Sequence, residues 1–206
     1  MQYGCGLVAP PEWTNFDASP TLKIQKMPLI GVVMKRQLNT VFPRNVLCGD
    51  IVKGLPVNEN SCDGLYCSHV LEHLSLNDFR KALTNSYRIL KKGGIFRLVV
   101  PDLEIEARSY IRELDRNNPS SSVKFIGSTL IGTVERPRGI RGITEHIFGN
   151  SRHLWMWDTQ SITHELQNTG FTGIRNCMFG DCTDKMFEKV ENADRFNFCV
   201  AIECTK

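Results

Sequence analysis

The middle of the chain alternates between strand-like and helix-like patterns. Residues 62–67 and 95–100 are short, mostly apolar runs of the kind found in strands that are buried on both faces. After the first run, a capping box that begins at Ser75 and apolar residues at helical spacing predict a helix that ends near Gly93. After the second run, Asp102 can cap another helix. This order of strands and helices predicts an α/β protein with a parallel sheet.

Further elements are predicted on both sides of this unit. Short strand candidates cover residues 14–17 and 45–48, and each lies beside a carboxylate. A helix is predicted over residues 158–170, with an aspartate as its cap and a glycine at its end. The runs 171–179 and 196–204 then predict a closing β-hairpin, whose long connection contains a charged helical turn.

The chain has 206 residues, which is long enough to bury a real core without disulfides or metal ions. No repeat, low-complexity tract or linker divides it, so we expect a single domain over residues 1–206. Residues 119–152 are rich in Gly, Ser and Arg and have little periodicity. Long loops of this kind are often lids or binding segments, so we expect a substrate-binding loop here.

Composition excludes several classes of protein. The formal charge is only +3, so we expect no nucleic-acid partner. No run approaches the ~18 apolar residues of a membrane helix, so we expect no membrane span. The first residues do not resemble a secretory signal, which predicts a cytoplasmic protein. The eight cysteines are expected to be reduced, and without a Cys-x-x-Cys motif or a close Cys/His cluster we expect no metal site.

Candidate ligand-binding residues follow the first three predicted strands. In a doubly wound sheet, ligands bind at the carboxyl ends of the strands. Gly4 and Gly6 close the first strand and allow close approach of the backbone to a ligand. Asp17 ends the second strand, where a carboxylate can accept hydrogen bonds from both ribose hydroxyls. Asp50 ends the third strand, within reach of a nucleobase amino group.

Residues 4–9 also satisfy the G-x-G-x-x-A form of the dinucleotide-binding pattern. Pro10 and Pro11 nevertheless supply no N–H groups for a pyrophosphate. Only eleven positions separate Gly6 from Asp17, whereas the dinucleotide fold needs about 20. A nucleoside ligand without phosphates fits better, and a nicotinamide-dependent enzyme is the disfavoured alternative.

Six motifs occur in a specific order. They are Tyr-Gly-Cys-Gly at 3–6, Trp-Thr-Asn-Phe-Asp-Ala-Ser-Pro at 13–20, Cys-Gly-Asp-Ile at 48–51, Ser-His-Val-Leu-Glu-His-Leu at 68–74, Arg-Ile-Leu-Lys-Lys-Gly-Gly at 88–94 and Val-Val-Pro-Asp-Leu at 99–103. In this order they resemble the class I S-adenosylmethionine-dependent methyltransferases, and most of all the methyltransferase type 11 group, including its small members found among surface-polysaccharide genes. The likeness covers residues 1–103 and returns at 152–158 and 166–171.

The resemblance implies a Rossmann-like, seven-stranded and mostly parallel sheet with an antiparallel C-terminal hairpin and helices on both faces. It also implies S-adenosylmethionine as cofactor and S-adenosylhomocysteine as product. By the same resemblance, eight residues hold the cofactor: Gly4, Cys5 and Gly6 at its methionine end, Asp17 at its ribose, Asp50 and Ile51 at its adenine, and Ser68 and His69 along the cleft. Two positions depart from the family pattern, because Gln2 replaces a frequent acidic residue and Val8 a frequent third glycine.

The activity implied is methyl transfer to an O or N atom of a small molecule or saccharide. For a hydroxyl acceptor the protein must also remove a proton, and histidine is the natural base. We expect His153 to be this base, with His146 and His69 as further candidates, whereas His73 and His164 are expected to be structural. A hydrogen-bonded or surface role for each candidate histidine stays open, as does alignment of an amine without a base.

The predicted substrate-binding loop carries a set of arginines, Arg136, Arg138, Arg141 and Arg152. Guanidinium groups bind carboxylates and phosphates well, so this set suits an acidic acceptor. A solvated loop is the plainer interpretation. The alternative function, from another class, is a non-catalytic partner subunit that keeps the fold and binds the cofactor or a protein. Gln2 and Val8 keep this alternative open.

Overall fold

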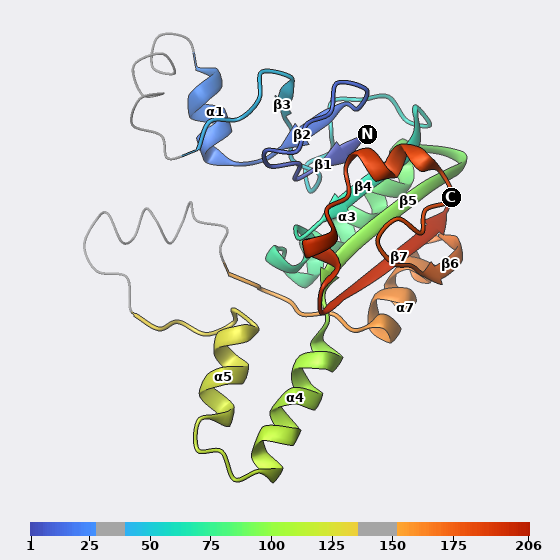
Figure 1. The fold of residues 1–206 in the computed structure, drawn as a ribbon. Helices are drawn as coiled ribbons and strands as arrows, with labels where there is room; N and C mark the ends of the chain where they lie inside the picture. The colour runs from blue at the N-terminus through green and yellow to red at the C-terminus, as the bar shows by residue number, and fades with distance from the viewer. Residues whose placement is uncertain (28–39, 136–151) are drawn as a thin grey trace.

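A computed structural model describes residues 1–27, 40–135 and 152–206. In these residues one seven-stranded sheet has the order β3-β2-β1-β4-β5-β7-β6 (Figure 1). The strands are β1 (Gln2–Tyr3), β2 (Asn15–Asp17), β3 (Val46–Cys48), β4 (Cys62–Ser68), β5 (Leu90–Pro101), β6 (Thr172–Asn176) and β7 (Cys199–Thr205). Strands β1 to β5 pair in parallel, and β7 pairs antiparallel with both β5 and β6. The predicted Rossmann-like fold class is confirmed.

One face of the sheet is covered by α3 (Leu76–Ile89) and α7 (Thr159–Thr169). Both helices begin at the predicted caps: Ser75 accepts a hydrogen bond from the Asp78 amide at 3.3 Å, and Asp158 accepts one from the Ser161 amide at 2.7 Å. Their apolar faces pack on alternate residues of the central strands, as expected of amphipathic helices. The largest core cluster of the described chain lies here, with Phe79, Leu83, Ile162 and Leu166 from the helices and Phe96, Leu98, Val100 and Ile202 from the strands.

Helix α3 ends at Ile89, earlier than the sequence pattern predicts. Leu90 is fully buried and pairs with Cys62, so it already belongs to β5. Burial of Leu90 in the sheet therefore outweighs continuation of the helix, and Gly93 takes its left-handed conformation (φ +78°) within the strand rather than at a helix end.

The opposite face is covered by the connection between β6 and β7. This connection contains the predicted helical turn as two short 3-10 helices, η2 (Lys185–Lys189) and η3 (Ala193–Phe196). Phe187 of η2 packs edge-on against Trp13, with ring centroids 5.4 Å apart, and both belong to a second core cluster with Tyr66 and Val99. Helices therefore lie on both faces as predicted, although on this face they are only single turns.

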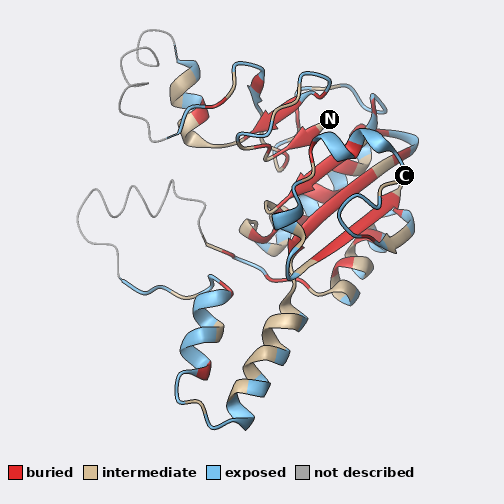
Figure 2. Cartoon of the chain, in the orientation of Figure 1, coloured by how far each residue is buried: buried red, intermediate tan, exposed pale blue. Residues whose placement is uncertain are grey.

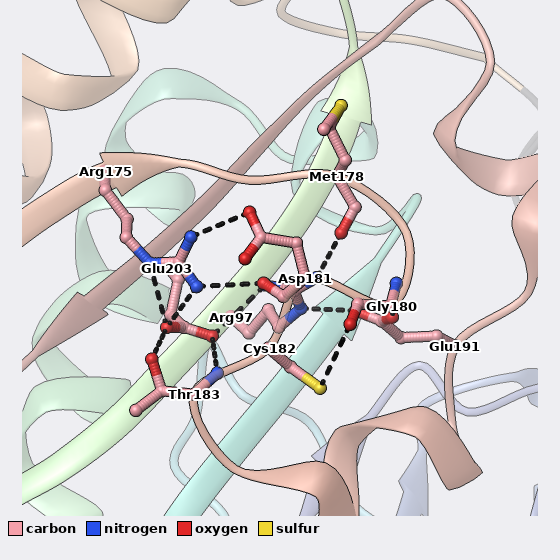
Figure 3. A network of polar contacts seen from close by, with 9 residues as sticks. All are labelled: Arg97, Arg175, Met178, Gly180, Asp181, Cys182, Thr183, Glu191 and Glu203. Atoms are coloured by element: carbon pink, nitrogen blue, oxygen red, sulfur yellow. Dashed lines mark hydrogen bonds and ion pairs between the residues drawn. The ribbon is translucent and has the colours of Figure 1, made fainter.

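A buried polar network fixes this connection to the sheet (Figure 3). Arg97 of β5 is fully buried, pairs with Glu191, and donates to Glu203 of β7 at 3.1 Å. It also donates to the carbonyls of Asp181 at 2.8 Å and Met178 at 2.6 Å. A buried charge needs such partners, since an unpaired one is strongly destabilising. Burial raises the pKa of Glu203, but hydrogen bonds from Thr183 and Arg175 outweigh it and hold that pKa below its ordinary value.

Helices α4 (Leu103–Asp115) and α5 (Ser121–Ser128) project from the sheet as a pair (Figure 1). Figure 2 shows that the buried residues concentrate in the sheet, and α4 contains none. Helix α5 lies inside residues 119–152, which the sequence analysis treats as a loop, so this part of that expectation is wrong. The serine and glycine residues of α5 have low helix propensity, which weakens the helical pattern in the sequence. In the structure, Phe125 of α5 packs against Tyr110 of α4, with ring centroids 5.4 Å apart.

Two further elements adjoin the strand ends, α1 (Pro20–Lys26) after β2 and the 3-10 turn η1 (Leu71–His73) after β4. Among the described helices, none has the length and apolar character that a membrane crossing requires.

The Arg97 network predicts an acid-sensitive contribution to stability. Because the pKa of Glu203 is depressed in the folded state, its contribution is present above its ordinary pKa of 4.5 and is lost as pH falls through the folded value. We expect Glu203→Gln to lower the free energy of unfolding by about 3 kcal/mol at pH 7, since one partner of a buried pair is removed. In urea titrations the difference from the wild type should shrink below pH 4.5. The exposed variant Glu188→Gln should change stability by less than about 0.5 kcal/mol, and a pH-independent difference for Glu203→Gln would contradict the assignment.

Candidate functional site

A cavity of about 310 Å³ opens at the carboxyl ends of β1 to β4. This is the edge of the sheet at which the sequence predicts ligand binding. Its wall comes from four segments: Tyr3 and Gly4 after β1, Asp17 to Pro20 after β2, Gly49 to Val52 after β3, and His69, Val70, His73 and Leu74 after β4, with Phe42 closing one side.

Gly4 brings the backbone of the first loop directly against the turn after β4. Its φ is +65°, and a Cβ atom there would lie only 2.1 Å from Cγ2 of Val70. Among the described glycines, Gly4 alone combines a positive φ with so close an approach. Gly6 also has a positive φ of +53°, but a Cβ atom there would meet nothing within 4 Å.

Gln2 holds the same loop through side-chain hydrogen bonds. Its side-chain amide donates to the carbonyl of Val8 and to Oδ1 of Asn15, both at 2.7 Å. The side chain that replaces the family's acidic residue is thus occupied in holding the loop to β2 and does not belong to the cavity wall.

Asp17 is the buried carboxylate of the cavity. Its Oδ2 accepts a hydrogen bond from the Gly6 amide at 3.0 Å, and its Oδ1 accepts one from the Ser19 amide at 2.8 Å. Each carboxylate oxygen has about two acceptor positions, so each retains one for a ligand donor. The two backbone amides thus fix the orientation of a group that can accept two more hydrogen bonds.

The turn after β3 forms the apolar side of the cavity. Oδ1 of Asp50 accepts from the Val52 amide at 3.0 Å, and Ile51 is buried beside it. Asn85 of α3 donates to the Ile51 carbonyl at 2.7 Å, which ties the turn to the helix. The loop therefore presents an apolar side chain next to a carboxylate.

Of the eight predicted cofactor residues, five line the cavity: Gly4, Asp17, Asp50, Ile51 and His69. The other three do not. Cys5 packs in a small core cluster with Leu22 of α1, Gly6 contributes only its amide to Asp17, and Ser68 is buried in β4.

His69 occupies a strained position at the end of β4, with a φ of +54°. Its Nε2 hydrogen-bonds with the Arg195 carbonyl at 2.9 Å and lies 3.6 Å from Sγ of Cys199, while its Nδ1 lies 3.4 Å from Oε1 of Glu72. Burial alone lowers the pKa of His69, but its interactions with Cys199, Glu72 and the Arg195 carbonyl outweigh this and raise the pKa to about 10. Three neighbours thus hold the ring at the cavity wall.

His153 lies behind the cavity wall. Its ring packs edge-on against His73, with centroids 5.1 Å apart, and burial is the main cause that lowers its pKa. His146 and the arginines at 136, 138 and 141 fall outside the described residues, and Arg152 is described. The structure leaves the proposed base roles as predictions.

His73 lines the cavity although the sequence analysis expects it to be structural. It lies in the 3-10 turn η1 and not on a long helix, so it stays at the carboxyl edge of the sheet. The sequence contains a signal for this position, because His73 follows the end of β4 by only five residues. Residues so close to the end of a strand stay at the carboxyl edge of the sheet.

Comparison with known families follows this geometry. The family model for a methyltransferase domain matches residues 4–98, just under half of the chain. Residues 4–98 therefore resemble a methyltransferase domain. The family and fold implied by the sequence motifs are confirmed, and S-adenosylmethionine is the cofactor of this family. The link to surface-polysaccharide genes stays a prediction.

Solved structures agree on the fold. A SAM-dependent methyltransferase from Archaeoglobus fulgidus has a TM-score of 0.50 and 16% identity, with 100% of this chain and 84% of that chain covered. PigF with SAH has a TM-score of 0.51 and 14% identity, and this chain covers 49% of it. A possible histamine N-methyltransferase from Thermotoga maritima has 20% identity and a TM-score of 0.49, with 100% and 80% covered. No curated protein sequence matches the chain.

The two glycines of the first loop give a matched test of the cavity geometry. Gly4→Ala and Gly6→Ala both place a side chain at positive φ, which costs about 1 kcal/mol. Only the Gly4→Ala variant also drives a methyl group into Val70, and overpacking adds about 1–3 kcal/mol. Urea denaturation should therefore rank Gly4→Ala well below Gly6→Ala in stability. Equal losses would show that Val70 moves aside freely.

Proposed function

We propose that the chain binds S-adenosylmethionine in the cavity at the ends of β1 to β4 and transfers its methyl group to an O or N atom of a small molecule or saccharide. The observation that carries the proposal is the Asp17 carboxylate, which lies buried at the cavity wall with one acceptor position left on each oxygen. A nucleoside ribose offers two neighbouring hydroxyl donors, which is the matching pattern.

The rest of the wall fits the same cofactor. The apolar side chains of Ile51 and Phe42 suit the faces of an adenine ring, and the Asp50 carboxylate suits its amino group. The close backbone approach at Gly4 leaves room for the methionine end. Cys5 and Gly6 then act by shaping this loop, and Ser68 by supporting the turn that carries His69.

When bound, the cofactor supplies a methyl group already activated by its sulfonium. The residues of this chain contribute alignment, because a nucleophile held in line with the methyl group reacts as though present at high concentration.

The acceptor is proposed to approach from the side of η1 and residues 119–152. Thr129 and Leu130 follow α5, and the Leu130 carbonyl accepts a hydrogen bond from the His153 amide at 3.3 Å. The described part of the predicted substrate-binding loop therefore reaches His153, which packs against His73 of the cavity wall. Arg152 supplies one positive charge here, which suits an acidic acceptor.

Titration calorimetry tests the cofactor site directly. In a buffer with EDTA, the wild type should bind S-adenosylmethionine and S-adenosylhomocysteine, and Asp17→Asn should weaken both by about 10–100-fold. The reason is that hydrogen bonds to a charged acceptor contribute about 1.5–3 kcal/mol. Asp17→Asn keeps one oxygen acceptor for the loop amides, and circular dichroism checks that the variant is folded.

The control is Asp63→Asn, which removes an exposed carboxylate of β4 away from the cavity and should leave affinity unchanged. Absence of binding by the wild type would contradict the proposal. Tight cofactor binding with no turnover on hydroxyl, amine or saccharide acceptors would instead favour the non-catalytic partner subunit.

A further inference from the structure

Three side chains with metal-binding atoms meet beside the cavity. Glu72 and His73 come from η1, and His153 comes from a segment 80 positions later. One ligand atom of each lies within 4.8 Å of the other two, and Nε2 of His73 is 3.9 Å from Oε1 of Glu72. His73 also lines the cavity, so the cluster borders the proposed cofactor site.

The backbone holds this cluster together. The Glu72 carbonyl accepts hydrogen bonds from the amides of Leu154 at 2.8 Å and Trp155 at 3.2 Å. The His153 amide donates to the Leu130 carbonyl at 3.3 Å. Backbone contacts on both sides of His153 thus fix its ring against the turn after β4.

Two members of the cluster, Glu72 and His153, are buried and have side-chain atoms without a hydrogen-bond partner, whereas His73 is half-buried. Glu72 is 1% exposed and His153 is 8% exposed. Within the described residues, three atoms lack a hydrogen-bond partner: both carboxylate oxygens of Glu72 and Nδ1 of His153. The ring of His69 approaches Oε1 at 3.4 Å without hydrogen-bond geometry, and it leaves Oε2 uncovered. Buried polar atoms without a hydrogen bond cost free energy, so Oε2 of Glu72 and Nδ1 of His153 are positions where a ligand would be favourable.

The remaining histidine is oriented for the same purpose. Nδ1 of His73 hydrogen-bonds with the Arg152 carbonyl at 2.7 Å. As the donor in this bond, Nδ1 carries the proton of the neutral ring, and Nε2 keeps its lone pair on the side of Glu72. Metal-binding histidines are usually held in this way, with the second nitrogen fixed by a carbonyl or carboxylate.

We propose that Glu72, His73 and His153 bind a divalent transition-metal ion of the zinc class, with an open coordination position toward the cofactor cavity. Two imidazoles and one carboxylate form a typical three-ligand set for such a site, whereas Mg²⁺ and Ca²⁺ prefer oxygen ligands alone. Ligand atoms of a tetrahedral site are separated by ~3.3 Å at metal–ligand distances of ~2.0 Å. The ligand atoms, which lie within 4.8 Å of one another, therefore need to approach by at most about 1.5 Å. His69 becomes an outer partner that orients the Glu72 carboxylate.

If the chain transfers a methyl group as proposed above, this metal site also selects the class of acceptor. A metal ion lowers the pKa of a bound hydroxyl, so the acceptor is an alcohol, phenol or sugar hydroxyl and not an amine. The hydroxyl gives its proton to solvent, its oxygen forms the bond to the methyl carbon, and the methyl–sulfur bond breaks with the electron pair left on sulfur. In this reaction His153 is a ligand and not the base.

Metal binding is measured with Co²⁺ and Zn²⁺ on the full chain after removal of metal by EDTA and dialysis. We expect one equivalent of Co²⁺ with the visible absorption of a four- or five-coordinate site, displaced by Zn²⁺ but not by Mg²⁺. Glu72→Gln and His153→Ala should each weaken Co²⁺ binding by about 100-fold or more, whereas His69→Ala should weaken it by about tenfold, as for an outer partner.

The matched control is His164→Ala, which removes an exposed imidazole of α7 and should leave Co²⁺ binding unchanged. Thermal denaturation identifies any variant that fails to fold. If the cluster variants do not fold, the Co²⁺ titration of the wild type alone decides whether the metal site exists. The proposal is overturned if the wild type binds neither ion, if the cluster variants bind as tightly as the wild type, or if near-ultraviolet thiolate charge-transfer bands show that cysteines are the ligands. Since S-adenosylhomocysteine binding is measured in EDTA, loss of the metal site and loss of the cofactor site give different results.

Discussion

Arg97 is the interaction on which the second face of the sheet depends. In the described part of the chain no long helix covers this face, and its cover is the irregular connection between β6 and β7, whose helices are two short 3-10 segments. The fully buried guanidinium binds that connection through Glu191 and two backbone carbonyls while it pairs with Glu203 in the sheet. The same connection supplies the Arg195 carbonyl that holds His69 at the cavity. A buried charge in β5 is thus linked, through one segment, to the geometry of the functional site.

The short connection between β1 and β2 has the opposite role, because it limits what can bind. Pro10 and Pro11 follow the first loop, and the described chain has turns there instead of a helix between β1 and β2. Without a helix N-terminus the loop offers no dipole for a pyrophosphate. The loop instead closes on Asp17 through the Gly6 amide, so the carboxylate is the dominant polar group of this side. This is consistent with a nucleoside ligand that carries no phosphate.

The sequence predicts those parts of the fold that have local signals. Ser75 and Asp158 begin helices where their capping patterns indicate, and the strand ends bring Asp17 and Asp50 to one cavity. The end of α3 is missed because burial of Leu90 in the sheet decides it, which no local pattern records. The cluster of Glu72 with His153 is missed for a related reason. Its members come from distant segments, and only backbone contacts made after folding bring them together.

The two halves of the site are therefore built in different ways. The proposed cofactor half uses residues 4–51 and the turn after β4, in which each side chain follows its own strand. The acceptor half depends on residues 152–157, which are tied to the Glu72 carbonyl at the end of β4 and, through the Trp157 carbonyl and the Leu103 amide at 2.8 Å, to the end of β5. Since these ties use backbone groups, side chains of this segment can change without loss of its position. The family match ends at residue 98, before this segment begins, so the proposed acceptor half lies outside the matched residues.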